Sequence, residues 1–308
     1  MTVTRRSIIK VGAGFLLTGV SGGAYARFVE PGGSMALARY RLTPPRWTAG
    51  LNVRLVALAD LHCGSAHMPL SRIEEIVDIT HALEPDVIVL LGDYVTSKRR
   101  MVHDISHAQW ASALKRLRAP LGVHVILGNH EYWDDELVQR RGHGDSAGQM
   151  ALEDAGLPVL NNRVVRLTKD GHPFWVAGLA DQLAFKIGYD RKRGGLYRGL
   201  DDLQGTLAQA SDGSPVILLA HEPDIFASLP DTSFTANLAV TLSGHTHGGQ
   251  INLLGWRPII PSQFGSRYAH GHIVEAGRNL IVSAGLGTSG PPVRFGVPPE
   301  IVVVELGG

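Results

Sequence analysis

Five short polar motifs each follow an apolar run of the chain, and they carry residue types that bind metal ions in proteins. The motifs are Asp60-x-His62, Gly92-Asp93, Gly128-Asn129-His130-Glu131, His221 and Gly244-His245-Thr246-His247. Carboxylate and amide oxygens mixed with imidazole nitrogens, without a thiolate, suit Mn, Fe, Zn or Mg. Seven ligands from these motifs are too many for one tetrahedral ion, but they suit two ions that share a bridging carboxylate.

Each motif alone also has an ordinary structural explanation. An Asp-x-His or Gly-Asp pair is commonly a turn with a solvated carboxylate, and Gly-Asn-His could be a turn whose Asn tolerates a left-handed conformation. All five motifs, however, follow segments that are expected to be strands. Ligands of α/β sheets gather outside the carboxyl ends of the strands, so the combination favours one shared site.

The apolar runs that precede and follow these motifs predict an α/β fold. Expected strands cover residues 53–59, 87–91, 123–127, 164–167, 174–179, 216–220, 238–242, 280–283 and 301–305. Between the first two, Ser71 and Glu74 predict a capping box that opens a helix with an inward face, formed by Ile73, Ile76, Val77 and Ile79. Two packed sheets flanked by helices are expected. Residues 188–200, rich in Arg, Lys and Gly, are expected to form an exposed loop or cap.

The first 26 residues have the composition of an export signal. Arg5-Arg6 precedes a modestly apolar run, and Ala24-Tyr25-Ala26 offers a small-x-small cleavage site. These features predict export by the twin-arginine machinery to the periplasm or cell-envelope space, with a membrane tether as the alternative if the signal is not cleaved. We therefore expect a signal over residues 1–26, a connecting segment over 27–49 and one catalytic-type domain over 50–308.

Composition and charge narrow the class of protein. Of 308 residues, 44% are apolar and 19% charged, which provides a buried core and excludes a disordered chain. The net charge is +1, and removal of residues 1–26 leaves 26 basic and 28 acidic side chains, net −2. Such a balance argues against long nucleic acid as a partner. A single cysteine, Cys63, excludes an intrachain disulfide.

The ordered set DLH, GDYV, GNHE, HEP and GHTHGGQ resembles the motifs of the calcineurin-like metallophosphoesterase superfamily over about residues 50–306. The twin-arginine start, LSGHTHGGQI and PVRFGVPPEI are typical of its exported YkuE/YaeI-like branch. The resemblance implies a four-layer αββα sandwich of two mixed sheets, with a dinuclear metal site at the carboxyl ends of the strands.

The same resemblance implies a role for each motif residue. The first divalent ion would be held by Asp60, His62, Asp93 and His247. The second ion would share Asp93 as a bridge and take Asn129, His221 and His245. His130 would remain unligated and would bind phosphate or protonate the leaving oxygen. The implied activity is hydrolysis of phosphodiester bonds by in-line attack of a metal-bound hydroxide, with Mn, Zn, Fe or Co as the candidate ions.

The second motif departs from that of the protein serine/threonine phosphatases of this superfamily. Asp93 is followed by Tyr-Val-Thr-Ser, where those enzymes continue to Asp-Arg, so the acid that orients their catalytic histidine has no counterpart here. This lowers the expectation of a phosphoprotein substrate and leaves the orienting partner of His130 open.

Arg294 is expected either to contact substrate phosphate or to form a structural salt bridge. Tyr132 and Trp133 either line the mouth of the site or cover the core.

Three functions remain open at the level of sequence. A phosphodiesterase is favoured, and a phosphomonoesterase acting on small phosphates is the alternative of the same class. A non-catalytic envelope protein that binds metal or phosphate is the alternative of a different class. The substrate and the oligomeric state are not readable from the sequence.

Overall fold

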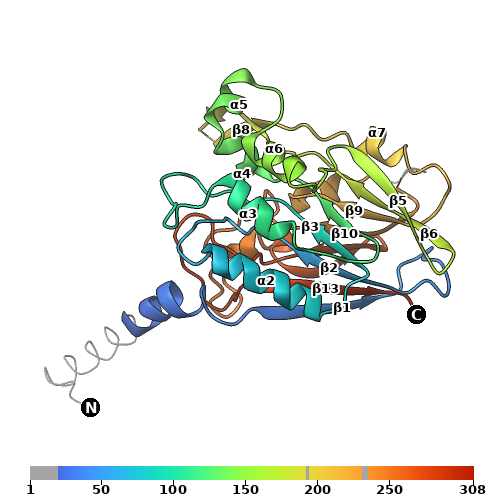
Figure 1. Cartoon of the computed structure of the whole chain (residues 1–308), viewed down its shortest axis with the longest axis horizontal. Helices are drawn as coiled ribbons and strands as arrows, with labels where there is room; N and C mark the ends of the chain where they lie inside the picture. Colours follow the sequence, from blue (N-terminus) through green and yellow to red (C-terminus); the bar gives the residue numbers. More distant parts are fainter. Residues whose placement is uncertain (1–19, 192–193, 231–234) are drawn as a thin grey trace, which may run out of the picture.

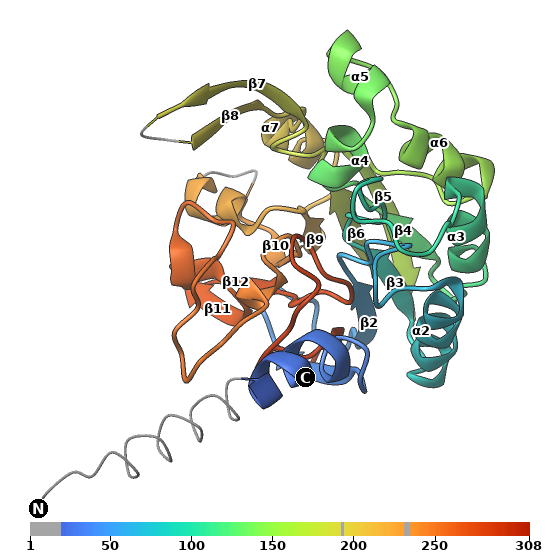
Figure 2. The same cartoon turned by 90° about the vertical axis from the view of Figure 1, so that its left-hand side faces the viewer.

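A computed structural model describes residues 20–191, 194–230 and 235–308 (Figure 1). Arg5-Arg6 and the rest of the predicted export signal up to residue 19 lie outside the described residues. Two large sheets form the centre of the molecule, and helices lie on their outer faces (Figures 1 and 2). The described helices include no segment of the length and apolarity needed to cross a bilayer.

The first sheet has five strands in the order β1-β13-β2-β3-β4. Its strands are β1 (Ala36–Leu42), β2 (Val53–Leu58), β3 (Val87–Leu90), β4 (Val123–Val125) and β13 (Glu300–Leu306). β2, β3 and β4 are parallel, so their carboxyl ends lie at one edge of the sheet. β13 runs antiparallel to β2 and parallel to β1.

The second sheet has six strands in the order β11-β12-β10-β9-β6-β5. Its strands are β5 (Arg163–Lys169), β6 (His172–Gly178), β9 (Val216–Leu219), β10 (Leu238–Ser243), β11 (Gly271–Glu275) and β12 (Arg278–Val282). The four central strands are parallel, and β5 and β11 pair antiparallel at the two edges.

Alternation along the strands builds three apolar layers. Leu55 and Ala57 of β2 pack into the core between the two sheets, whereas Val56 and Leu58 of the same strand face the helices on the other side. That outer face is covered by α2 (Leu70–Ala82), α3 (His107–Leu114) and α6 (Ala147–Asp154). The outer face of the second sheet is covered by α7 (Leu203–Leu207), η2 (Pro223–Ser228) and η4 (Gly265–Tyr268). The predicted four-layer αββα sandwich of two mixed sheets is confirmed.

The start of α2 differs from its sequence prediction. The residue before the helix is Pro69, and no side chain caps the first turn. Ser71 lies inside that turn rather than before it, so its hydroxyl cannot serve as the cap of a Ser71–Glu74 capping box. A capping box does occur at α3, where the Ser106 side chain and Gln109 bond reciprocally. Ile73, Ile76 and Val77 are buried as expected, and Ile79 is partly buried and packs against the same core. Thr80 is buried as well, and its hydroxyl donates to the Ile76 carbonyl.

Two segments that were expected to lack regular structure form strands. β1 lies within the 27–49 segment and pairs over its whole length with β13, so this part of the expected connection belongs to the first sheet. Residues 188–200 are mostly part of a two-stranded hairpin, β7 (Phe185–Asp190) and β8 (Gly194–Arg198). Both strands are largely exposed on both faces, so neither has the buried apolar alternation that identifies a strand in sequence.

The described end of the predicted signal segment, and the residues that follow it, are docked on the rest of the fold. A helix that begins by Val20 continues into the π-helical turn η1 (Tyr25–Val29). The buried carboxylate of Glu30 accepts hydrogen bonds from the backbone N–H groups of Gly296 and Val297, at 3.0 and 2.7 Å. The Ala26 carbonyl accepts from the Arg294 N–H. The predicted cleavage point after Ala26 therefore falls within a helical turn that is fastened to the 294–297 loop.

Candidate metal centre

The motif residues meet at the edge where the parallel strands of both sheets end, the edge that faces the viewer in Figure 2. Asp60 and His62 follow β2, and Asp93 follows β3. Asn129 and His130 open the short helix α4 (Asn129–Trp133) after β4. On the second sheet, three ligand-type residues follow β9 and β10, with the last at the start of η3 (His247–Gly249): His221, His245 and His247.

The first cluster comprises four buried side chains whose ligand atoms all lie within 4.8 Å of one another: Asp60, His62, Asp93 and His247. The Nε2 atoms of His62 and His247 are 3.1 Å apart, and the two rings are stacked. His62 Nε2 is also 3.7 Å from Asp93 Oδ2. This group can hold one ion between two carboxylates and two imidazoles.

The second cluster uses the same carboxylate. Asp93, His221 and His245 have ligand atoms within 4.8 Å of one another, and His221 Nε2 lies 3.3 Å from Asp93 Oδ2. The amide oxygen of Asn129 is 2.9 Å from His245 Nδ1, which adds a fourth ligand-type group. Because Asp93 belongs to both clusters, its carboxylate would be shared by the two ions.

The chemistry of these groups fits bound cations. His221 Nε2 is buried and lies 3.3 Å from Asp93 Oδ2 without a hydrogen bond of good geometry, an arrangement that suits an ion held by both atoms. Burial lowers the pKa of His62 to about 4 and that of His245 to about 3, so both rings are neutral and can ligate. Burial, together with the negative charge of Asp93, raises the pKa of Asp60 to about 7 in spite of the nearby His221 and Arg294.

Backbone carbonyls set the orientation of two imidazole ligands. The Nδ1–H of His62 faces the Val95 carbonyl at 2.9 Å, and that of His221 faces the Leu91 carbonyl at 2.7 Å. With Nδ1 donating, each ring turns the lone pair of Nε2 toward the shared carboxylate.

The backbone at the ligands is strained. Five ligand-type residues have a positive φ, between 46° and 70°: Asp60, His62, Asp93, His245 and His247. Left-handed backbone at non-glycine residues costs about 1–3 kcal/mol each and is typical of functional sites. Two motif glycines permit the close approach that this requires. A Cβ on Gly128 would lie 2.4 Å from Asp93 Oδ1, and one on Gly244 would lie 2.7 Å from Asp60 Oδ2.

Glu131 fixes the loop that carries Asp93. It is buried, and its carboxylate accepts four backbone N–H groups at 2.8–3.1 Å, those of Asp93, Tyr94, Val95 and Gly128. The sequence prediction placed this glutamate in a motif but assigned it no role. A glutamate that lies among buried residues indicates that its carboxylate accepts hydrogen bonds from backbone N–H groups there.

Replacing Glu131 with glutamine is expected to lower the free energy of unfolding by about 3 kcal/mol. An amide presents an NH₂ group where the carboxylate accepted, so at least one buried backbone N–H loses its partner. Urea denaturation monitored by circular dichroism measures the change. The control is Glu153→Gln on the exposed face of α6, expected to be near neutral. Equal stability of the two variants would contradict this role.

His130 lies beside both clusters but belongs to neither. Its ring is edge-on to His62, with centroids 4.9 Å apart, and its Nδ1 is 2.6 Å from Asp134 Oδ2. Burial lowers the pKa of His130, but the negative charges of Asp93 and Asp134 outweigh it and hold the pKa above its usual value. Asp134 is thus the orienting acid that the motif comparison left open. It is four residues after His130, one turn along α4, a spacing that would have identified it.

Arg294 does not reach the open side of the centre. It is fully buried, and its Nη2 lies 3.5 Å from His247 Nδ1. Its guanidinium donates at 2.6–3.1 Å to the backbone carbonyls of Ala284, Gly285, Gly287 and Val297. The expectation of a contact with substrate is therefore corrected, because all of its N–H groups point into the loop beneath His247. Its hydrogen-bond acceptors are carbonyls, so it is not the expected salt bridge either.

A cleft of about 1300 Å³ opens above the two clusters. Asp93, Asn129, His130, His245 and His247 line its floor. Its walls come from the β7–β8 hairpin, η2, and the loops at residues 258–263 and 289–293. Trp133 lines the cleft and stacks on Tyr197 at 5.0 Å, whereas Tyr132 is buried in the core, so the two neighbouring aromatics have different roles.

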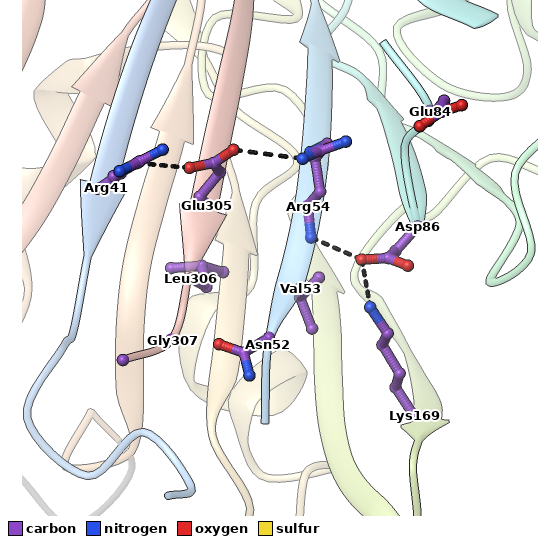
Figure 3. Close-up of a pocket in the computed structure, with 11 residues that line it drawn as sticks. Arg41, Asn52, Val53, Arg54, Glu84, Asp86, Lys169, Glu305, Leu306 and Gly307 are labelled. Carbon is purple, nitrogen blue, oxygen red and sulfur yellow. Dashed lines mark hydrogen bonds and ion pairs between the residues drawn. The ribbon is translucent and has the colours of Figure 1, made fainter. Parts of the chain in front are cut away.

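A second hollow, of about 450 Å³, lies at the opposite edge of the first sheet, where β2 begins (Figure 3). Most of its charged side chains pair with one another. Glu305 bonds Arg41 at 2.6 Å and Arg54 at 3.5 Å, and Asp86 bonds Lys169 at 2.6 Å. None of the motif residues lines this hollow. The side chains that can do chemistry are therefore in the larger cleft.

Comparisons with known proteins agree with this geometry. Residues 53–249 match the family model described as calcineurin-like phosphoesterase. The chain is 31% identical to the uncharacterized metallophosphoesterase YkuE of Bacillus subtilis (strain 168), over 99% of this chain and 98% of that protein. It is 28% identical to an uncharacterized metallophosphoesterase of Aquifex aeolicus, over 89% and 92% of the two chains. A dimetal phosphatase from Danio rerio aligns with 78% of this chain and 89% of its own, at 14% identity and a TM-score of 0.44.

The family match covers four of the five motifs completely and the GHTHGG core of the fifth. The match to YkuE extends over nearly the whole of both chains. The predicted resemblance is confirmed, and the chain belongs to the calcineurin-like phosphoesterase family of metal-dependent phosphoric ester hydrolases.

Proposed function

We propose that this protein is an exported phosphodiesterase that works with two divalent metal ions. The observation that carries the proposal is the arrangement of two ligand clusters around one shared carboxylate, with His130 beside them and outside both. A protein that only stored metal or phosphate would need no such unligated histidine held by an acid. The centre also opens into a cleft large enough for a substituted phosphate.

When bound, the cations would supply Lewis-acid activation of water and neutralise charge on the phosphoryl oxygens. The chain's own residues do the rest. Asp134 accepts a hydrogen bond from His130 Nδ1, so the remaining proton of the imidazolium is on Nε2. That nitrogen faces the cleft, 3.4 Å from Ser289 Oγ. We assign His130 Nε2 as the donor that protonates the leaving oxygen.

The cleft favours a diester over a monoester. Among the described residues that line it, Arg100 is the one Arg or Lys side chain. A monoester dianion is usually clamped by several such groups, whereas a diester carries one negative charge and a second organic substituent. The walls offer apolar surface on both sides of the floor, from Leu196 and Tyr197 on the hairpin to Ile259 and Ile260 opposite.

Export by the twin-arginine machinery is part of the proposal. It is supported by Arg5-Arg6 and by the absence of any need for disulfides, since the single cysteine, Cys63, is buried in the core beneath α2. A folded protein could carry its metals through that route. The ligand set of oxygens and imidazoles accepts Mn, Zn, Fe or Co, and the ion in the cell depends on supply as well as affinity.

Hydrolysis of bis-p-nitrophenyl phosphate is expected to require added divalent metal and to stop on chelation. Full-length protein would be stripped with EDTA and assayed with Mn, Zn, Fe or Co, on this diester and on p-nitrophenyl phosphate. A kcat/KM at least about tenfold higher for the diester supports the proposal. A preference for the monoester would establish the phosphomonoesterase alternative. Failure to turn over either ester, with both metals bound, would leave a binding protein.

A further inference from the structure

Two exposed apolar segments stand on opposite sides of the cleft mouth. They are the β7–β8 hairpin over residues 185–191 and 194–198, and the loop over residues 253–264; together we call them the rim. Nineteen large apolar side chains are exposed among the described residues, and nine of these belong to the two rim segments. The nine are Ile187, Tyr189, Leu196, Tyr197, Leu253, Leu254, Trp256, Ile259 and Phe264. Exposed apolar surface so concentrated marks a contact region.

The tip of the loop is built to present its side chains. Leu253 and Trp256 pair across a tight turn, and Leu254 at its apex is fully exposed with a φ of +54°. A left-handed leucine with no packing partner is strained, and such strain persists where a segment serves a contact. Trp256 is 62% exposed at the same tip. Tryptophan and leucine at an exposed turn are typical of segments that enter the interfacial layer of a bilayer.

The charge of the hairpin also constrains which kind of surface could bind the rim. The described residues of the hairpin contain three basic residues and one acidic residue, net +2, although the chain without residues 1–26 has a net charge of −2. A basic segment carrying exposed Ile187 and Tyr189 is complementary to a surface that is both apolar and anionic. Anionic lipid bilayers combine these two properties.

The position of the rim decides between a bilayer and a protein partner. Residues of both segments line the same cleft, Leu196 and Tyr197 from one side and Ile259 and Ile260 from the other. Figure 2 shows the hairpin at the top of the molecule and the orange segments beneath it. A protein seated on both segments would therefore cover the cleft mouth and block entry. A bilayer would present its own phosphate esters to that mouth.

The aromatic wall inside the cleft and the described end of the leader are also consistent with a lipid surface. Trp133, stacked on Tyr197, is beside His130, with ring centroids 5.8 Å apart. The group that leaves with a proton from His130 would thus meet an aromatic wall that continues into the rim. The described end of the leader, with exposed Tyr25 and Phe28, lies toward the viewer on the same face (Figure 2).

We propose that the rim docks on an anionic lipid surface and that the cleft takes phosphate esters of lipids from that surface. The choice of substrate rests on the proposed phosphodiesterase function, whereas docking does not, because it requires no turnover. Rim residues enter the interfacial layer, the basic hairpin meets the anionic headgroups, and the cleft mouth opens between them.

Sedimentation with vesicles tests the docking without any assay of hydrolysis. Full-length protein would be mixed with vesicles of phosphatidylcholine alone or with an equal part of phosphatidylglycerol. The test variant is Leu254→Ser with Trp256→Ser. The matched control is Leu137→Ser with Met150→Ser, which removes two exposed apolar side chains from α5 (Glu136–Arg141) and α6, outside the cleft. All three proteins keep the same leader, so any binding through the leader is common to them.

We expect binding to the anionic vesicles that weakens with added salt, and at least a tenfold weaker binding by the rim variant. The control should bind like the wild type, and all three should have the same thermal unfolding midpoint. Equal binding by the rim variant and the control would overturn the proposal, as would absence of binding. A dimer in sedimentation velocity that only the rim variant dissociates would also overturn it, because a second copy would then cover the rim.

Discussion

Replacing Asp93 with asparagine is expected to abolish binding of one or both metal ions and to lower kcat by at least about a thousandfold. Asp93 is the one carboxylate that belongs to both ligand clusters, and an amide has a single oxygen able to ligate. Lewis-acid stabilisation of the phosphoryl oxygens supplies several kcal/mol, which corresponds to this factor. Asparagine keeps the size of the side chain and can still accept the His130 N–H that Asp93 Oδ1 accepts at 2.9 Å.

The measurement that separates metal loss from misfolding is thermal unfolding with and without Mn. Wild-type protein should be stabilised by saturating metal, because the ions bind the folded state, and the Asp93→Asn variant should show a much smaller rise. Elemental analysis gives the number of ions per chain. Asp104→Asn, at an exposed position away from the clusters, serves as the control and should bind two. An Asp93→Asn protein that retains two ions and its activity would refute the bridging role.

Replacing His130 with glutamine is expected to lower kcat about 10²–10⁴-fold while the metal content stays unchanged. The loss depends on the leaving group. p-Nitrophenolate departs readily without a proton, so the loss should be small on bis-p-nitrophenyl phosphate and large on a diester with an alkyl leaving group. A residue that only bound the phosphate would reduce both rates alike. His143→Gln, at an exposed position, is the control and should change neither.

The pH dependence identifies the partner of His130. Because the charges of Asp93 and Asp134 raise the pKa of His130, its donating form persists to higher pH, and kcat should fall as the pH rises through that pKa. Asp134→Asn removes one of the raising interactions, so the alkaline limb should move to lower pH, with a fall in kcat of about 10–100-fold at neutral pH. Bound cations lower the pKa of His130 in the wild type and in the variant alike. The test is therefore the difference in this pKa between the two proteins. An unchanged limb would show that Asp134 has no part in the proton transfer.

The sequence predicted those strands and site residues whose positions follow from a short local pattern of residue types. The buried runs of β2, β3, β9 and β10 are short and apolar, and each is followed by a polar motif, so their carboxyl ends could be matched with the ligand-type residues. Parallel strands place these ends at one edge, which is why residues as distant as Asp60 and His247 could be expected to meet. The fold class followed from the same alternation. Strands such as β7 and β8, exposed on both faces, have no such pattern and were not found.

Other features of the site depend on which distant segments pack together, so only the tertiary structure decided them. The burial of Arg294 beneath His247 results from the path of the 284–297 loop, and no neighbouring residue indicates it. The rim arises because a hairpin and a loop some 60 residues apart flank one cleft. Residue type and spacing determined the chemistry available to this chain, whereas packing determined which groups face the substrate, because exposure is a property of the whole fold.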